Sequence, residues 1–229
     1  MQGFYLADVP RGTSAEIIKE CSTWNIVMIW IDEQKLKELK EMAPEHLRVP
    51  EIQRAVAFDV ETPNGKSERM CSIGITVIEK NTITKSVEYR INPEQDFDWF
   101  CVKVHGITQQ EAEVEPIFPE VWPKIRAELD TGLVLAHNAR FDLNVLRKCL
   151  YAYDIEFHDV QFADTVEIAR VLLGKTVPNH KLGTLCDWMG IPLDAHHAGS
   201  DSYGCAKIYL NLLEEYGPLS GFERTFHFL

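Results

Sequence analysis

The stretch AVAFDVETPNGKSERMCSIGITVIEKNTITKSVEYRI (residues 55–91) decides the fold class. It contains three runs rich in β-branched residues, 55–61, 70–80 and 82–91, and each is a predicted strand. Asn81 lies near the turn between the second and third runs, so these runs are expected to pair as a meander.

Further along the chain, helices alternate with short apolar strands. Helices are expected over 119–129, 139–153, 180–190 and 200–217, a strand over 133–138, and a segment that starts extended and turns helical over 162–173. Three consecutive strands followed by this alternation predict an α/β fold, with a mixed sheet covered by helices.

Residues 1–53 carry a separate pattern. Strands are expected at 4–9 and 26–31, and helices at 15–24 and 33–42, the first opened by the capping-box pair Thr13 and Glu16. Prolines end the pattern in a linker at 43–53. The sequence therefore predicts a small βαβα appendage (1–53), a main domain (54–217) and a C-terminal tail (218–229). The appendage is expected to pack against the main domain, with a separate function as the alternative.

Composition narrows the class of protein. The formal net charge is −12, from 23 basic and 35 acidic residues, which argues against a protein that coats nucleic acid through bulk positive charge. An enzyme that holds a short nucleic-acid end through metal ions remains compatible with this charge. No apolar run of membrane-spanning length and no secretory signal is present, and the six cysteines never fall as C-x-x-C. We therefore expect a cytoplasmic protein with reduced thiols and no membrane partner.

Carboxylates stand in apolar surroundings at four positions. Asp59 and Glu61 are two apart on a predicted strand, so they share a face, while Val56, Phe58 and Val60 take the other. Two adjacent carboxylates repel each other, so either a cation lies between them or one is protonated. Asp142 falls in the first turn of a predicted helix, where it also suits the helix dipole.

Asp201 is the fourth acid. On a helix it shares one stripe with Cys205, Ile208 and Leu212, so it is expected to face the core, where an unpaired carboxylate is costly. Pairing with a histidine, capping of its own helix and metal binding all remain open. If the four acids converge, their oxygen-only ligands select Mg²⁺ or Mn²⁺.

Three motifs together resemble a known family. FDVET (58–62), AHNARFDLNVL (136–146) and HHAGSD (196–201) are similar to the exonuclease motifs of the DEDDh, or DnaQ-like, 3′–5′ exonucleases. This family includes the epsilon subunit of bacterial DNA polymerase III and stand-alone relatives. VHGIT (104–108), ADT (163–165) and HKLGTLCDWMGI (180–191) agree, so the resemblance covers about 54–215.

The resemblance implies a ribonuclease-H-like fold with a mixed five-stranded sheet. It also implies hydrolysis at a 3′ end with release of nucleoside 5′-monophosphates, using two divalent cations, Mg²⁺ or Mn²⁺. The implied metal-binding and catalytic acids are listed by motif match: Asp59, Glu61, Asp142 and Asp201. The implied catalytic base is His196, which stands at the family offset of five residues before the last aspartate.

His197 fills the offset at which the sister class carries a tyrosine, so it is the rival base. The resemblance further suggests substrate contacts from Thr62, His105, Asn138 and Phe141. His105 is equally well explained as a packed loop residue. The family run Thr-Thr-Gly is replaced by Thr62-Pro63-Asn64-Gly65, which alters the loop expected to meet the terminal nucleotide.

Three aromatic residues, Phe97, Trp99 and Phe100, are candidates for stacking on bases, but core packing is the favoured interpretation.

The predicted function is metal-dependent 3′–5′ exonuclease action on DNA, at a single-stranded or frayed 3′ end, in replication or repair. The alternatives are an exoribonuclease that trims RNA ends, and a nuclease-fold module that only binds nucleic acid or a replication protein. A further alternative is an interaction protein whose function lies in its first fifty residues.

Overall fold

The computed structural model describes residues 6–7, 17–18 and 49–228. The chain divides into two compact units, Met1–Arg48 and Val49–Leu229. In the first unit, β1 (Leu6–Ala7) pairs antiparallel with β2 (Ile17–Ile18). The expected helix over 15–24 is therefore wrong at Ile17 and Ile18, because two adjacent β-branched residues lose side-chain freedom in a helix and here pair as a strand. The remaining elements expected before residue 49 lie outside the described residues.

The second unit is an α/β fold built on one mixed sheet, in the order β5-β4-β3-β6-β7-β8. The strands are β3 (Arg54–Glu61), β4 (Ser72–Glu79), β5 (Thr82–Arg90), β6 (Leu133–Ala136), β7 (Val160–Asp164) and β8 (Arg224–Phe226). The first three form the expected antiparallel meander, and β6 and β7 add in parallel. Asn81 occupies the β4–β5 turn with a positive φ of 60°.

The sheet has six strands instead of five. The C-terminal tail supplies β8, which pairs antiparallel with β7 through Phe162, Gln161 and Val160. The tail therefore docks on its own chain, which the sequence alone left open.

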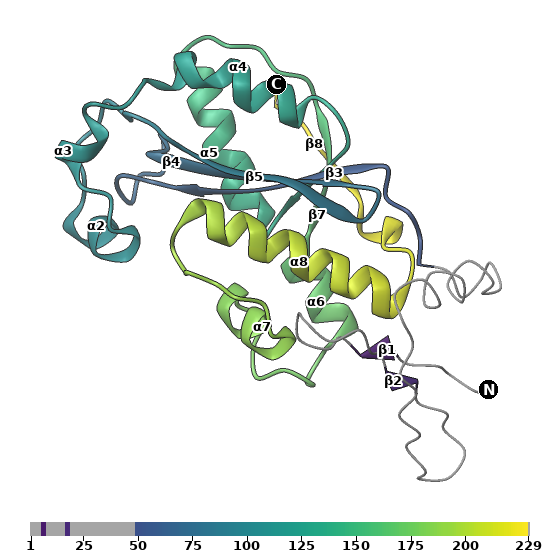
Figure 1. The fold of residues 1–229 in the computed structure, drawn as a ribbon. Coiled ribbons are helices and arrows are strands. Elements are labelled where there is room, and N and C mark those ends of the chain that lie inside the picture. Colours follow the sequence, from purple (N-terminus) through teal and green to yellow (C-terminus); the bar gives the residue numbers. More distant parts are fainter. Residues whose placement is uncertain (1–5, 8–16, 19–48, 229) are drawn as a thin grey trace. The chain divides into compact units, whose positions relative to one another are not determined.

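Helices cover both faces of the sheet (Figure 1). They are α2 (Trp99–His105), α3 (Gln109–Ala112), α4 (Phe118–Leu129), α5 (Ala139–Ala152), α6 (Thr165–Leu172), α7 (Leu182–Met189) and α8 (Ala198–Tyr216), with a short 3-10 turn, η2 (Ser220–Phe222). In Figure 1, α4 and α5 lie on one side of the sheet, and α6 and α8 lie on the other. No described helix is long and apolar enough to cross a membrane.

Alternation along β3 divides the core in two. Val56, Phe58 and Val60 face the cluster under α4 and α5, as predicted. Ala55 and Ala57 face the second cluster, to which Ile208 and Leu212 of α8 belong. Since successive side chains alternate, Asp59 and Glu61 continue the face that α8 covers. The five described cysteines are all free, as expected.

Candidate active site

The site lies where β3 ends and α8 begins. Asp201 is 7% exposed, and Cys205, Ile208 and Leu212 are buried with it, so the predicted inward stripe is confirmed. A ring nitrogen of His196 and carboxylate oxygens of Glu61 and Asp201 all lie within 4.8 Å of one another. The structure therefore brings together a strand-end acid, a helix-start acid and a histidine from the first and third motifs.

A glycine allows α8 to approach the sheet this closely. Gly74 stands opposite Asp59 on β3 and opposite Glu88 on β5, so these three residues form one row across the sheet. A Cβ on Gly74 would lie 1.9 Å from the carbonyl oxygen of Ala198. The first turn of α8 thus rests directly on the backbone of β4, beside Asp59.

Asp142 reaches the site from the other side of β3. It lies in the first turn of α5, is 2% exposed, and its Oδ1 accepts a hydrogen bond of 3.2 Å from the Val60 N–H. Burial raises the pKa of Asp142 to about 8, against the effect of its backbone hydrogen bonds. The carboxylates of Asp164 and Asp201 contribute to this rise in the pKa. Asp142 is therefore part of the same electrostatic cluster.

The acids oppose one another's ionisation. Burial, and then the carboxylates of Asp142 and Asp201, hold the pKa of Asp59 well above its usual range. Burial and the same two neighbours raise the pKa of Glu61 to about 8, with the Arg90 guanidinium acting in the opposite sense. Such mutual perturbation in a shared site is typical of carboxylates that need a positive charge between them.

The arrangement fits a divalent cation. Oδ2 of Asp201 accepts a hydrogen bond of 3.1 Å from the His196 N–H, whereas its buried Oδ1 has no hydrogen-bond partner among the described residues. A buried carboxylate oxygen without a donor is costly, and a cation is the partner that would relieve it. Oxygen donors from Glu61 and Asp201 suit Mg²⁺ or Mn²⁺.

The two histidines differ in position. His196 has a positive φ of 66° and turns back towards Asp201, and α8 begins only at Ala198, with His197 at its N-cap. The side chain of His197 lies with Nε2 3.6 Å from Oδ2 of Asp194. His196 is therefore the histidine that lies within the carboxylate cluster, while the ring of His197 faces an exposed acid.

His105 is placed as a packed residue. It is 3% exposed, its Nδ1 accepts a hydrogen bond from the Ile107 N–H, and its Nε2 lies 3.2 Å from the carbonyl oxygen of Thr62. Since Nδ1 accepts, Nε2 is the donor to Thr62. His105 thus anchors the segment that follows Glu61 and has no ring nitrogen free for a direct substrate contact.

The loop Thr62-Pro63-Asn64-Gly65 is fixed to the start of α2. The Asp98 N–H donates to the Pro63 carbonyl, and the Gly65 N–H donates to Asp98 Oδ2. The favoured core packing of Trp99 and Phe100 is wrong: their side chains are 76% and 60% exposed, because they lie on the outer side of this short helix. Phe97 is partly buried and packs against Ile107, Cys71 and Ala112.

Asn138 and Phe141 lie at the strand-to-helix corner before Asp142. Asn138 is exposed with a positive φ of 78°, and Phe141 is partly exposed in the first turn of α5. Both are accessible, and their contact with substrate remains a prediction.

Two acids near the site were not singled out from the sequence. Asp164 accepts hydrogen bonds from the N–H groups of Asn138, Ala139 and Val166, and so fixes the start of α5. Glu88 accepts from the Ser72 hydroxyl and the Gly199 N–H. The available signal for Asp164 was its place at a strand-to-helix junction in ADT (163–165), while Glu88 required the β4–β5 register.

Comparison with known proteins bears on these motifs. The family model described as exonuclease matches residues 56–209, which is more than half of the chain. This chain belongs to the DEDDh exonuclease family. By family membership, residues 56–209 form an exonuclease domain.

Among curated proteins, the 3′-5′ exonuclease DinG of Bacillus subtilis (strain 168) is 31% identical to this chain over 167 residues. The chain is 28% identical over 163 residues to a PolC-type DNA polymerase III of Caldanaerobacter subterraneus. These matches cover 71% and 70% of the chain but only 18% and 12% of the relatives, so the chain spans less than a fifth of their length.

Solved structures share the fold. Exonuclease X in complex with 5′ overhanging duplex DNA has a TM-score of 0.59 at 18% identity, covering 74% of this chain and 95% of the other. Exonuclease I of E. coli in complex with a dT13 oligonucleotide has a TM-score of 0.61 at 20% identity, covering 70% and 41%. At these identities the likeness supports the ribonuclease-H-like fold alone.

Proposed function

We propose that this exonuclease removes nucleotides one at a time from the 3′ end of DNA, with Asp59, Glu61, Asp142 and Asp201 as the acids that hold two divalent cations. The observation that carries the proposal is the buried Oδ1 of Asp201, which has no hydrogen-bond donor among the described residues and lies in a cluster with Glu61 and His196. The similarity of this chain to PolC-type DNA polymerase III favours DNA as the substrate.

The proposed hydrolysis requires charge stabilisation and a general base. When bound, the cations supply positive charge that stabilises the phosphoryl oxygens and the leaving 3′ oxygen of an in-line displacement. His196 is exposed and, among the described residues, is hydrogen-bonded only through its backbone, so its imidazole is free to accept the proton of the attacking water. An imidazole changes charge near neutral pH, which suits a general base.

Substrate positioning falls to the residues around the cluster. Thr62 is held by His105 and Asn138 by Asp164, so the backbone on either side of the cluster is fixed before substrate arrives. Phe141, Trp99 and Phe100 offer exposed ring surface on which a frayed terminal base can stack. Stacking tolerates every base, so we expect little sequence preference at the 3′ end.

The test is digestion of matched DNA and RNA oligonucleotides, labelled at the 3′ or the 5′ end, with Mg²⁺, Mn²⁺ or EDTA. We expect a 5′-labelled DNA strand to shorten stepwise, a 3′-labelled strand to lose its label at once, and EDTA to stop both. If RNA is digested faster than DNA, the substrate is RNA and the proposed DNA substrate is wrong. If the protein binds the oligonucleotides but digests none of them with either metal, it is a nucleic-acid-binding module, and the proposed enzymatic activity is refuted.

A further inference from the structure

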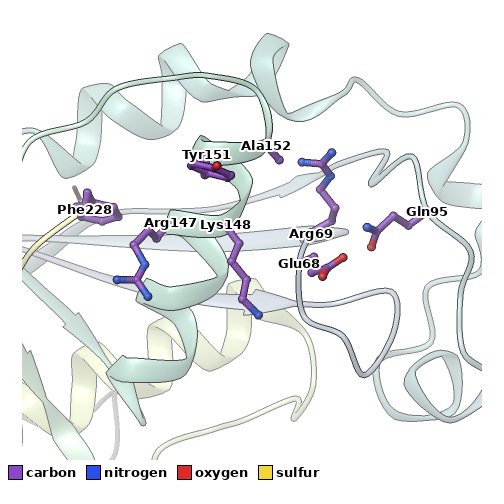
Figure 2. A pocket seen from close by; sticks show the side chains of 8 residues that line it. All are labelled: Glu68, Arg69, Gln95, Arg147, Lys148, Tyr151, Ala152 and Phe228. Carbon is purple, nitrogen blue, oxygen red and sulfur yellow. The ribbon is translucent and has the colours of Figure 1, made fainter.

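A cavity of about 380 Å³ is bordered by three cationic side chains, Arg69, Arg147 and Lys148 (Figure 2). Arg147 and Lys148 project from the exposed side of α5, whereas Asp142 projects from its buried side. At 3.6 residues per turn, the helix places the two cations well around its circumference from Asp142. The cavity is therefore distinct from the carboxylate cluster.

Charge in this cavity is unbalanced, although the chain as a whole carries a net charge of −12. Some cations elsewhere in the described residues meet carboxylates, as Arg54 meets Glu79 and Glu128, and Arg90 meets Glu88. No ion pair joins any of the three cavity cations to a carboxylate within the described part of the chain. Among the described residues that line the cavity, Glu68 is the one acid, so their summed charge is positive.

Of the three cations, Arg69 has buried hydrogen-bond donors without acceptors in the described part of the chain. Its Nε and Nη1 are buried and have no hydrogen-bond partner among the described residues. Its guanidinium carbon lies 4.4 Å from the centre of the Tyr153 ring. The ring attracts the positive charge of the guanidinium, but the N–H groups of the guanidinium still require hydrogen-bond acceptors. A planar fork of donors matches the oxygens of a phosphate.

The neighbouring side chains can act with Arg69. The Lys148 ammonium donates to the carbonyl oxygens of Lys66 and Ser67, which uses two of its three donors. Arg147 contacts Asn144 through one nitrogen and lies over the Phe226 ring, so no carboxylate of the described residues compensates its charge. Tyr151 is 88% exposed at the rim of the cavity.

We propose that the Arg69 cavity is a phosphate-binding subsite. The inference rests on the proposed function, in that the phosphate belongs to the backbone of a strand whose 3′ end lies at the carboxylate cluster. The loop from Glu61 to Arg69 connects the two places, and Lys148 holds this loop at Lys66 and Ser67. A released mononucleotide offers the same phosphate chemistry, and the exposed Tyr151 ring could stack on the base of either.

The experiment measures binding in EDTA, where turnover is not expected. Wild type, Arg69→Gln and Arg147→Gln are titrated with a fluorescein-labelled DNA trinucleotide, with a sixteen-nucleotide strand and with a nucleoside 5′-monophosphate, over a range of salt concentrations. The control is Lys80→Gln, which removes the same charge from the β4–β5 turn at the opposite end of the strands from Glu61. Thermal melting of each variant confirms that it is folded.

For a strand phosphate, we expect Arg69→Gln to weaken binding of the long strand roughly tenfold. The slope of log affinity against log salt should fall by about 0.7, as for one lost contact on a single strand. Arg147→Gln, which leaves the Tyr153 contact intact, should act in the same direction, and Lys80→Gln should match wild type. A loss confined to the mononucleotide would assign the subsite to free phosphate esters.

Unchanged affinity of both folded variants for all three ligands would overturn the proposal. Digestion by the wild type, measured separately with metal, tests the proposed function. If the wild type digests DNA and both variants bind as tightly as the wild type, the phosphate subsite is refuted and the proposed function stands.

Discussion

Replacement of Gly74 by alanine tests whether the acids must be held as closely as the structure places them. A Cβ at this position would lie 1.9 Å from the Ala198 carbonyl oxygen and 2.5 Å from the Gly199 nitrogen, against an ordinary contact of 3.4 Å or more. Both neighbours are backbone atoms, so no side chain can rotate aside. The first turn of α8 must therefore retreat from β4 by about 1.5 Å.

This retreat would carry His196 and Asp201 away from Asp59 and Glu61. Overpacking of this kind costs roughly 1–3 kcal/mol of stability. A misplacement of about 1 Å in an active site costs roughly 10²-fold in rate. We therefore expect Gly74→Ala to fold, to melt at a lower temperature, and to lose at least about 10²-fold in kcat and much of its Mn²⁺ affinity.

The assay is digestion of a 5′-labelled DNA strand, alongside Mn²⁺ titration by calorimetry and thermal melting. The control is Gly221→Ala, because a Cβ there would meet nothing within 4 Å. Wild-type kcat and Mn²⁺ affinity in folded Gly74→Ala would refute the reasoning, since the helix start would then have no need to rest on β4.

Three further changes probe the cluster. Asp59→Asn or Asp201→Asn should abolish digestion and, because each relieves repulsion, raise the melting temperature in EDTA; digestion at the wild-type rate would contradict the assignment. His196→Gln should lower kcat by roughly 10²–10⁴-fold, while His197→Gln should change it far less; the reverse order would make His197 the base. Metal-free protein should lose stability as pH rises from about 4.5 to 8, by about 1.4 kcal/mol per pH unit for each proton retained. The sign follows because Glu61 and Asp142, with pKa values of about 8, keep protons that the unfolded chain has lost. Melting in EDTA at several pH values checks this, and a flat profile would contradict it.

The sequence predicts those parts of the site that local periodicity determines. The period of two along β3 places Asp59 and Glu61 on one face, and the helical period places Asp201 on the buried stripe of α8. Glu88 escapes such reasoning, because its face depends on a β4–β5 register that shifts between Val77 and Ile78. The exposure of Trp99 is likewise a tertiary result, since aromatic residues are usually buried.

β8 shows the same limit at the level of the fold. Three residues, Arg224–Phe226, are too few to carry a strand pattern of their own, and they become a strand only because the edge of β7 offers unpaired backbone groups. A short segment whose conformation is determined by pairing with a neighbouring strand cannot be recognised from its own composition. The five-strand expectation failed for this reason.

The distribution of charge gives the acidic composition a physical meaning. A net charge of −12 would repel a polyanion if the acids were spread evenly. Instead, Glu61 and Asp201 lie together with His196, and Asp59 and Asp142 interact electrostatically with the same acids, so bound cations would reverse the sign of the local field there. Arg69, Arg147 and Lys148 gather on another side of α5 without carboxylate partners among the described residues. A nucleic-acid end would therefore meet positive charge at two separate places, and only the first depends on metal, so chelation should stop digestion without abolishing binding.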